Sequence, residues 1–307
     1  MNQIVNLKNI VRICLLLVVA VQVQAGSFNI SSDFSGFVNI GAKELFVKYS
    51  APAENKPTLI LLNGLTYSTN QWFAMTYYLK QQGFGVLAYD MDGMGLTLLR
   101  YGVKTEPYHY SDQVDDLLKL LNTLKISQPY NLVGLSYGGG IGAAFSFKYP
   151  QFVNKLVMMA PYTQPLQKQD ESIKQQISYT RIMFPMNTAS DDQLYDYYLR
   201  QSVYTTYPSA EPIVLENPIK LEAVFRLTQG IRKLNVISEV TKFPKKSVYL
   251  IIAKNDQYIP ADVLENFWNA IPASARVEKI YIENSEHKIP EARPLKAAEV
   301  LGTIFSK

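Results

Sequence analysis

Short apolar runs alternate with amphipathic stretches along most of this chain. Continuous apolar runs of five or six residues are typical of strands that are buried on both faces of a parallel sheet. Such runs occupy residues 58–62, 85–89, 130–135, 155–160, 247–252 and 277–282, after a predicted strand pair at 37–40 and 45–49. Apolar residues at helical spacing predict helices at 70–82, 112–124, 139–148 and 261–271. The alternation indicates the α/β class with a mainly parallel sheet.

The alternation breaks at Pro161, and no strong strand pattern returns before about Phe243. The intervening stretch is polar, rich in tyrosine and helical in pattern at 191–201 and 221–234. We therefore predict an inserted helical cap over residues 162–243, within one domain that spans residues 26–307. Its aromatic residues are expected to pack the cap onto the core, with the lining of an acyl pocket as the alternative; they are Tyr162, Tyr179, Phe184, Tyr195, Tyr197, Tyr198, Tyr204, Tyr207 and Phe225.

Residues 1–25 have the pattern of a secretory signal peptide. Lys8 and Arg12 precede an apolar run at 13–21, and small residues follow directly before Gly26. We expect cleavage before Gly26 and export of the mature protein to the periplasm or beyond the cell. An uncleaved anchor is the alternative reading, but nine apolar residues fall short of the roughly 20 that span a bilayer.

Composition narrows the possible partners. The chain has 307 residues, of which 48% are hydrophobic, which is enough for one globular domain with a full core. The 30 basic and 26 acidic residues give a net charge of +4, and loss of Lys8 and Arg12 with the signal lowers it to +2. This balance favours neither nucleic acid nor an anionic membrane surface as a partner. The single cysteine, Cys14, lies in the signal, so the mature protein is expected to fold without disulfides.

Gly134-Leu135-Ser136-Tyr137-Gly138 matches the pattern Gly-x-Ser-x-Gly. An apolar run precedes it and a helix with small residues follows it, which is the context that a nucleophilic serine requires. The glycines leave room for a tight turn from strand to helix, where side chains would collide with neighbouring elements. These features predict Ser136 as a nucleophile.

A serine nucleophile needs a general base, and the chain contains only His109 and His287. His287 follows the last predicted strand, whereas His109 precedes the nucleophile and is interpreted as a surface or packing residue. Asp256 follows another apolar run, and the order Ser136, Asp256, His287 is the one expected around such a turn. We therefore predict these three residues as a catalytic triad.

Acyl transfer also requires backbone donors for the developing oxyanion. The amide of Tyr137 follows the nucleophile directly. Asn63-Gly64-Leu65 comes immediately after the run at 58–62, where the amide of Leu65 can supply a second donor. Leu65 and Tyr137 are the predicted oxyanion-hole residues.

Several of these motifs together resemble one superfamily. They are Asn63-Gly64 followed by Trp72, the segment Tyr89-Asp90-Met91-Asp92-Gly93-Met94-Gly95, the serine turn, Asn255-Asp256 with Pro260, and His287. The sequence resembles esterases and lipases of the α/β-hydrolase superfamily that carry a cap. The resemblance implies an eight-stranded sheet flanked by helices, a cap after the sixth strand, no cofactor, no metal ligands, and hydrolysis of an ester or related acyl group.

Two positions depart from the family's usual pattern. Asn63 stands where a histidine commonly precedes the oxyanion glycine, and residues 93–97 lack the histidine and arginine often found there. These departures bear on the subfamily more than on the reaction.

The predicted function is that of a serine hydrolase that forms an acyl-enzyme with a small or lipid-like ester, including one with a hydrophobic acyl chain. A lysophospholipase, a thioesterase, an aminopeptidase and a carbon–carbon bond hydrolase remain alternatives on the same scaffold. A non-catalytic binding protein that kept the fold is a further alternative. No nucleic acid partner and no stable membrane span are expected.

Overall fold

A computed structural model describes residues 32–206 and 219–306, so the predicted signal peptide lies outside the described residues. The described strands form one eight-stranded sheet with the order β1-β2-β4-β3-β5-β6-β7-β8. Their bounds are Phe34–Asn39 (β1), Glu44–Ser50 (β2), Thr58–Leu62 (β3), Gly85–Asp90 (β4), Tyr130–Leu135 (β5), Val153–Met159 (β6), Val248–Ala253 (β7) and Arg276–Ile282 (β8). Each predicted apolar run corresponds to a strand.

Six strands, β3 to β8, run parallel, whereas β1 and β2 form an antiparallel edge. The central strands β4, β5 and β7 are buried at every position, because helices cover both faces of a parallel sheet. Only a strand without a polar face can be buried in this way. The prediction of a mainly parallel eight-stranded sheet is confirmed.

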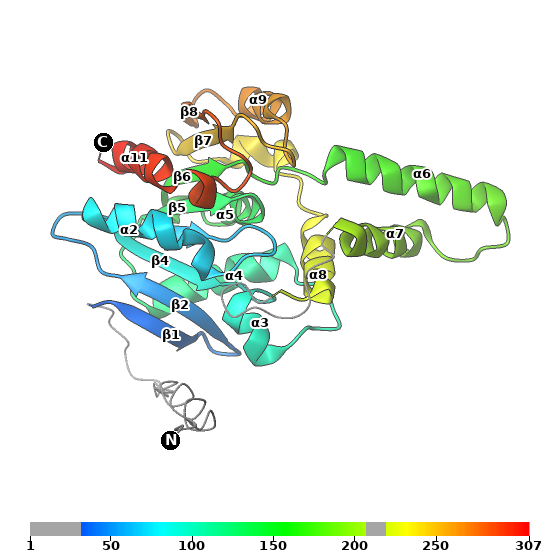
Figure 1. The fold of residues 1–307 in the computed structure, drawn as a ribbon, viewed down its shortest axis with the longest axis horizontal. Helices are drawn as coiled ribbons and strands as arrows, with labels where there is room; N and C mark the ends of the chain where they lie inside the picture. The colour runs from blue at the N-terminus through cyan, green and yellow to red at the C-terminus, as the bar shows by residue number, and fades with distance from the viewer. Residues whose placement is uncertain (1–31, 207–218, 307) are drawn as a thin grey trace, which may run out of the picture.

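Helices flank this sheet (Figure 1). They are η1 (Thr69–Trp72), α2 (Phe73–Gln81), α3 (Gly95–Tyr101), α4 (Tyr110–Thr123), α5 (Tyr137–Lys148), η2 (Pro150–Phe152), α9 (Ala261–Ala270), α10 (Ile289–Ala292) and α11 (Pro294–Phe305). Helix α2 packs against α11, and α4 packs against α5. Among the described residues, none of the helices is both long and apolar enough to cross a membrane.

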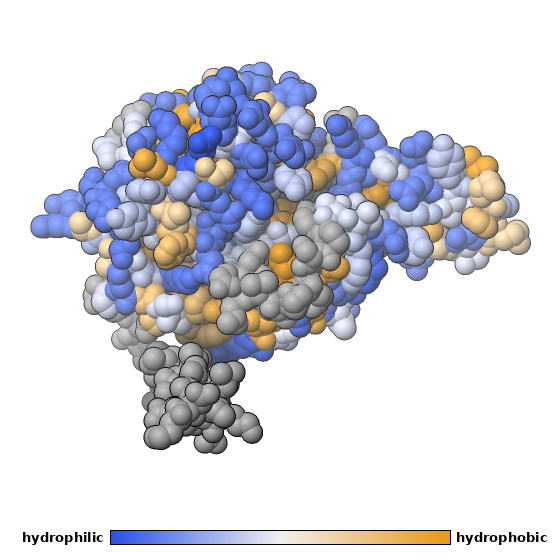
Figure 2. All heavy atoms as spheres, in the orientation of Figure 1, coloured by the Kyte–Doolittle hydropathy of each residue, from blue (hydrophilic) through white to orange (hydrophobic). Residues whose placement is uncertain are grey.

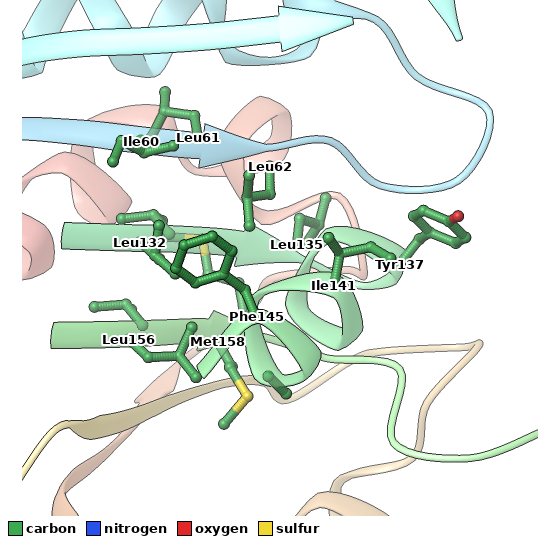
Figure 3. Packing of buried hydrophobic residues seen from close by; sticks show 14 of the residues in the cluster. Ile60, Leu61, Leu62, Leu132, Leu135, Tyr137, Ile141, Phe145, Leu156 and Met158 are labelled. Atoms are coloured by element: carbon green, nitrogen blue, oxygen red, sulfur yellow. The ribbon is translucent and has the colours of Figure 1, made fainter. Parts of the chain in front are cut away.

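Part of the main core lies between the sheet and α5 (Figure 3). Leu62 of β3, Leu132 of β5 and Leu156 of β6 are fully buried there, beneath Ile141 and Phe145 of α5. The first turns of α5 contain three consecutive glycines, which let the helix approach the strands closely. This close approach fixes the position of the turn between β5 and α5.

Three further helices lie between β6 and β7: α6 (Gln167–Met183), α7 (Asp191–Thr206) and α8 (Leu221–Ile231), followed by η3 (Ile237–Lys242). Helices α6 and α7 run side by side and extend away from the sheet; we call this pair the arm (Figure 1). Helix α8 stays close to the sheet, because Gly230 packs directly on the backbone at Tyr108. The amide of Tyr108 also donates to the carbonyl of Arg226 at 3.2 Å.

A second, smaller apolar cluster holds the arm together. Its members come from α6, α7 and α8 and are Ile173, Ile177, Leu194, Leu199, Val203, Val224 and Phe225. The expectation that the aromatic residues of this region pack onto the core holds for Tyr162, whereas Tyr195, Tyr198 and Phe225 pack in the smaller cluster. It is wrong for Tyr179, Phe184, Tyr197 and Tyr204, whose side chains are exposed, while Tyr207 lies outside the described residues.

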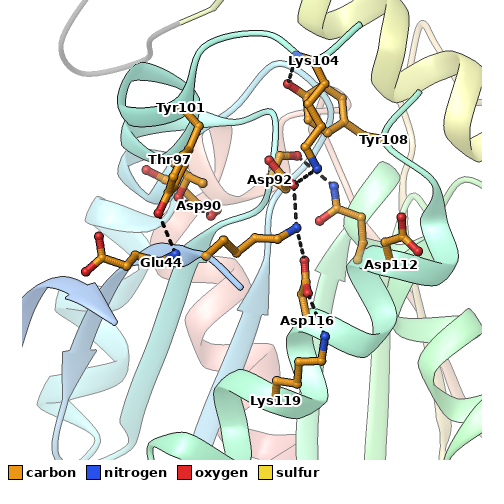
Figure 4. Close-up of polar contacts among 12 residues, drawn as sticks. Glu44, Asp90, Asp92, Thr97, Tyr101, Lys104, Tyr108, Asp112, Asp116 and Lys119 are labelled. Carbon is orange, nitrogen blue, oxygen red and sulfur yellow. Dashed lines mark hydrogen bonds and ion pairs between the residues drawn. The ribbon is translucent and has the colours of Figure 1, made fainter. Parts of the chain in front are cut away.

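A polar network lies beside β4 and α4 (Figure 4). The ammonium of Lys43 contacts the carboxylates of Asp92 at 2.7 Å and Asp116 at 2.8 Å, and Lys104 contacts Asp92 at 2.5 Å. Burial alone would lower the pKa of Lys43, but its hydrogen bonds to the two carboxylates raise it above its ordinary value. The network ties the loop after β4 to α4.

Candidate active site

Ser136 lies between the last residue of β5 and the first residue of α5. Its backbone has φ 50° and ψ −114°, a conformation that costs a side-chain-bearing residue on the order of 1–3 kcal/mol. Two hydrogen bonds hold it there: the Ser136 amide donates to the carbonyl of Met159 at 2.9 Å, and the amide of Tyr162 donates to the Ser136 carbonyl at 2.9 Å. The serine side chain is therefore presented on a rigid, sharp turn.

The two glycines of the motif are required by close packing. A Cβ at Gly134 would overlap with the backbone of Gly138, and a Cβ at Gly138 would overlap with the carbonyl of Leu62. The start of α5 thus rests directly on the carboxyl end of β3. The same approach brings the amide of Tyr137 next to the loop that follows β3.

His287 and Asp256 form a hydrogen-bonded pair. Imidazole Nδ1 lies 2.7 Å from Asp256 Oδ2, and the Asp256 carboxyl group is completely shielded from solvent. The other carboxylate oxygen accepts hydrogen bonds from the amides of Tyr258 at 2.8 Å and Ile259 at 2.9 Å. Because the carboxylate is an acceptor, the proton of neutral His287 belongs on Nδ1, which leaves Nε2 as a proton acceptor.

Leu65 lies in the loop after β3 and packs against both the main core and the smaller apolar cluster of the arm. Gly64 before it donates its amide to the side chain of Gln71 at 3.0 Å, and its α-carbon faces the side chain of Leu135. Leu135 directly precedes the serine. The predicted oxyanion-hole amides of Leu65 and Tyr137 therefore belong to neighbouring segments, the loop after β3 and the first turn of α5.

Two contacts place the loop that carries His287 beside the loop of Leu65 and the loop of Asp256. The ammonium of Lys288 lies 5.4 Å from the centre of the Tyr67 ring, and Tyr67 is only two residues from Leu65. The ring of Tyr258 lies 5.2 Å from the ring of His287. The interaction with Tyr67 raises the pKa of Lys288, and burial raises the pKa of Tyr67. Sequence reasoning did not single out Tyr67, Tyr258 or Lys288, although each lies within two residues of a predicted site residue.

The structure does not join all three predicted triad residues by hydrogen bonds. The bond between Asp256 and His287 is formed, but among the described residues none links the Ser136 hydroxyl to the imidazole. Catalytic hydrogen bonds are often long before substrate is bound. His109 is exposed at the N-terminus of α4, as its interpretation as a surface residue predicts.

The positions that departed from the family pattern have structural roles. The side chain of Asn63 accepts a hydrogen bond from the Trp72 indole at 2.7 Å and donates to the carbonyl of Tyr89 at 3.1 Å. Asp90 is fully buried and accepts hydrogen bonds from the amides of Thr69 at 2.6 Å and Leu96 at 2.8 Å. Burial raises the pKa of Asp90 to about 6. The side chains of Asn63 and Asp90 thus hold the loops after β3 and β4 in place.

Of two cavities in the structure, one lies away from the predicted catalytic residues and the other lies beside the loop of Leu65. A cavity of about 190 Å³ lies beside Lys43 and α4 and has none of the predicted catalytic residues in its lining. A second cavity, of about 10 Å³, lies between the loop after β3 and α8; its lining includes Thr66, Tyr67, Met94, Leu98, Val224 and Leu227. This space is about that of one water molecule. Among the described residues, no group of histidine, cysteine and carboxylate side chains is arranged to hold a metal ion.

Comparison with known proteins agrees with this architecture. A family model described as the alpha/beta hydrolase fold matches residues 57–294, and the chain belongs to this family. A hydrolase from Pseudomonas aeruginosa PA01 superposes with a TM-score of 0.62 at 20% identity, covering 91% of this chain and 100% of that one.

Curated relatives match over shorter stretches. A "Putative carbamate hydrolase RutD" from Caulobacter sp. (strain K31) is 29% identical over 38% of this chain and 42% of its own length. A "2-hydroxy-6-oxononadienedioate/2-hydroxy-6-oxononatrienedioate hydrolase" from Paraburkholderia phymatum is 33% identical over 41% of this chain and 44% of its own length. The alignments thus span less than half of these relatives.

Proposed function

We propose that this protein is a serine hydrolase that cleaves carboxylic esters through an acyl-enzyme. The observation that carries the proposal is the 2.7 Å hydrogen bond between His287 Nδ1 and the buried Asp256, which leaves Nε2 free to accept a proton. Ser136, on its sharp turn after β5, supplies the nucleophile. The carboxyl ends of parallel strands meet at one edge of a sheet, where a ligand can contact several loops at once.

In the proposed reaction, the Ser136 oxygen attacks the ester carbonyl carbon while Nε2 of His287 takes the hydroxyl proton. Asp256 stabilises the imidazolium and fixes the ring, and its own orientation is fixed by the amides of Tyr258 and Ile259. The imidazolium then donates the proton to the leaving alcohol. Water repeats the sequence on the acyl-enzyme and releases the acid.

The carbonyl oxygen becomes negatively charged in each tetrahedral intermediate. The amides of Tyr137 and Leu65 are the proposed donors to this oxyanion. Tyr137 is the first residue of α5, so its amide has no partner within the helix and lies at the positive end of the helix dipole. Both donors are backbone groups held by packing, so little reorganisation is needed as charge develops.

An apolar substituent suits the surroundings of this site. The small cavity beside Tyr67 is lined mainly by apolar side chains, including Met94, Leu98 and Leu227, with Lys220 as its one charged residue. We infer a hydrophobic acyl or alcohol group on the substrate. We also infer that α6, α7 and α8 act as the cap of this site, and that the protein is exported after loss of residues 1–25.

Carbon–carbon bond hydrolysis is a second candidate, because one relative, 33% identical, bears the name of such an enzyme. The substrate in that name is a dicarboxylate, which favours several cationic groups in the site. Among the described residues, Lys220 lies in the lining of the small cavity, and Lys288 lies beside Tyr67 of the same lining. Ester hydrolysis is the preferred proposal, because it requires no charged group on the substrate.

The test uses p-nitrophenyl esters of increasing chain length together with a fluorophosphonate probe. We expect turnover, and a single adduct at Ser136. Ser136→Ala and His287→Ala should each lower kcat at least about a thousandfold. His109→Ala is the matched control, because His109 is exposed on α4 and should leave kcat almost unchanged.

Three results would overturn the proposal. They are full activity in Ser136→Ala, an essential His109, and a folded protein that neither turns over esters nor reacts with the probe. Faster turnover of a 2-hydroxy-6-oxo-dienoate than of any ester would favour the second candidate.

A further inference from the structure

The far end of the arm carries an uninterrupted apolar surface. Five consecutive residues, Ile182-Met183-Phe184-Pro185-Met186, are all exposed and all apolar. The exposed fractions of the four largest are 72% for Ile182, 70% for Met183, 65% for Phe184 and 89% for Met186. We call these five residues the tip. Figure 2 shows the apolar residues gathered at the end of the arm, away from the sheet.

This exposure does not result from a loosely held loop. The guanidinium of Arg181 binds the carbonyls of Asn187 at 3.1 Å and Ala189 at 2.6 Å, and the carboxylate of Asp191 at 2.6 Å. Arg181 thus closes the connection between α6 and α7 with the tip outside it. These polar groups bind one another, while the apolar side chains of the tip face solvent.

Polar and amphipathic side chains surround the tip on the arm. Asn187, Ser190, Asp191 and Gln193 follow it at the start of α7 and are hydrogen-bonded among themselves or to Arg181. Tyr179, one helical turn before it, is 57% exposed. An apolar end followed by a tyrosine and then by polar groups matches the change in polarity across the boundary between the acyl chains and head groups of a bilayer.

The size and shape of the tip disfavour a protein partner. A stable protein–protein interface buries about 800 Å² on each partner, from roughly 20–30 residues. The tip has five residues and projects from the end of two helices, so it offers neither that area nor a complementary flat or concave face. A fluid bilayer needs no complementary shape, and burial of the exposed side chains in it removes apolar surface from water.

We propose that the tip inserts into the surface of a lipid bilayer and docks the protein there. The contact is interfacial and does not require a membrane-spanning helix. It also does not depend on the proposed ester hydrolysis, because the tip lies at the end of the arm that is remote from the sheet (Figure 1). Since the tip itself is uncharged, its contribution should be insensitive to salt and should not require anionic lipid.

The experiment measures partition of the full chain onto phosphatidylcholine vesicles by flotation, with Ser136→Ala in every variant so that no lipid is hydrolysed. The tip variant combines Ile182→Gln, Met183→Gln, Phe184→Gln and Met186→Gln, because glutamine keeps length and helix propensity. We expect the partition coefficient to fall about tenfold or more, by loss of apolar burial. High salt should not reproduce this loss.

A matched control changes exposed apolar residues at the other end of the molecule. Phe73→Gln, Tyr77→Gln and Leu295→Gln lie on α2 and α11, where the exposed fractions are 77%, 59% and 50%. This variant should partition like the parent. The segment before residue 32 is the same in all variants, so any lipid affinity of that segment cancels in the comparison.

A second readout reports on the tip directly. Phe184→Trp should show a blue-shifted emission and quenching by brominated acyl chains when vesicles are added, whereas Phe73→Trp should show neither. The proposal is overturned if the tip variant partitions like the parent, if the control alone loses binding, or if the tryptophan at 184 stays in water. It is also overturned if vesicles bind nothing and the tip instead drives self-association that the glutamine substitutions abolish.

Discussion

The sheet body and the arm keep their structure by different means. Strands β5 and β7 are buried at every position, and the largest fully buried side chains, such as Trp72 and Phe145, belong to the body. Helices α6 and α7 share only a narrow apolar seam, supplemented by polar contacts such as Tyr195 with Asp170 at 3.0 Å. Exposed polar contacts contribute little each. The body is therefore expected to unfold as one unit, and the arm to open locally before it.

The two regions meet at a residue of the proposed site. Leu65, whose amide is a proposed oxyanion donor, packs against the main core and against the arm's cluster. The rigid body holds Ser136, Asp256 and His287, while the loop that carries Leu65 contacts the weaker region. If α6, α7 and α8 act as the proposed cap, their movement should affect the loop that carries Leu65 before it affects the pair of His287 and Asp256.

The largest expected effect is at the elbow in the body. Gly138→Ala places a methyl group against the carbonyl of Leu62, which is backbone and cannot move aside easily. We expect a loss of about 3 kcal/mol or more in the free energy of unfolding, measured by urea denaturation. The control at the tip, Met186→Ala, is 89% exposed and should change it by less than about 0.5 kcal/mol. Equal stability of the two variants would contradict the close packing at the turn.

The next effect concerns pH and Asp90. Burial raises its pKa to about 6 from an ordinary 3.8, so the folded state holds the proton more tightly than the unfolded state. Its contribution to stability is therefore largest below about pH 4 and is lost as pH rises to about 6. From pH 4 to pH 7, we expect the free energy of unfolding of the wild type to fall by about 2 to 3 kcal/mol relative to that of Asp90→Asn. Urea unfolding curves check this, and a constant difference would exclude it.

A smaller, local effect separates the arm from the body most sharply. Leu199 of α7 is 1% exposed and belongs to the arm's cluster. Leu199→Ala should lower the free energy of local opening in α6 and α7 by about 2 kcal/mol, which speeds hydrogen exchange of their amides. Exchange of the sheet amides should stay unchanged. Leu250→Ala, fully buried in β7, should instead speed exchange throughout the sheet. Equal acceleration of sheet amides by Leu199→Ala would mean that arm and body form one cooperative unit.

The sequence pattern was sufficient for the strands of the body. Residues 58–62 and 130–135 were predicted as strands and are β3 and β5 with the same bounds. A strand buried on both faces must be apolar throughout, so its limits are visible as the ends of an apolar run. Helix α6 escaped prediction because only Ile173 and Ile177 face the cluster, and the residues before and between them are almost all polar. Helix α11 does carry a helical pattern, because Ala297, Leu301 and Ile304 recur at helical spacing and are buried.

Motif and order were enough to predict Ser136, Asp256 and His287 as a triad, because the chemistry restricts the choice of residue and the chain has two histidines. Only the tertiary structure brought His287 to Asp256, and Lys288 to Tyr67 more than two hundred residues earlier. Contacts between loops on different strands follow from strand order in the sheet, which no local pattern encodes.

The tip shows most clearly what the sequence alone does not determine. Ile182, Met183 and Phe184 are residue types that are usually buried, and composition alone assigns them to a core. Whether an apolar side chain is covered depends on which other elements reach it. The three-dimensional arrangement, with α6 and α7 projecting from the sheet, decided that nothing among the described residues covers these side chains. The sequence determined that they are apolar, and the fold determined that they face outward.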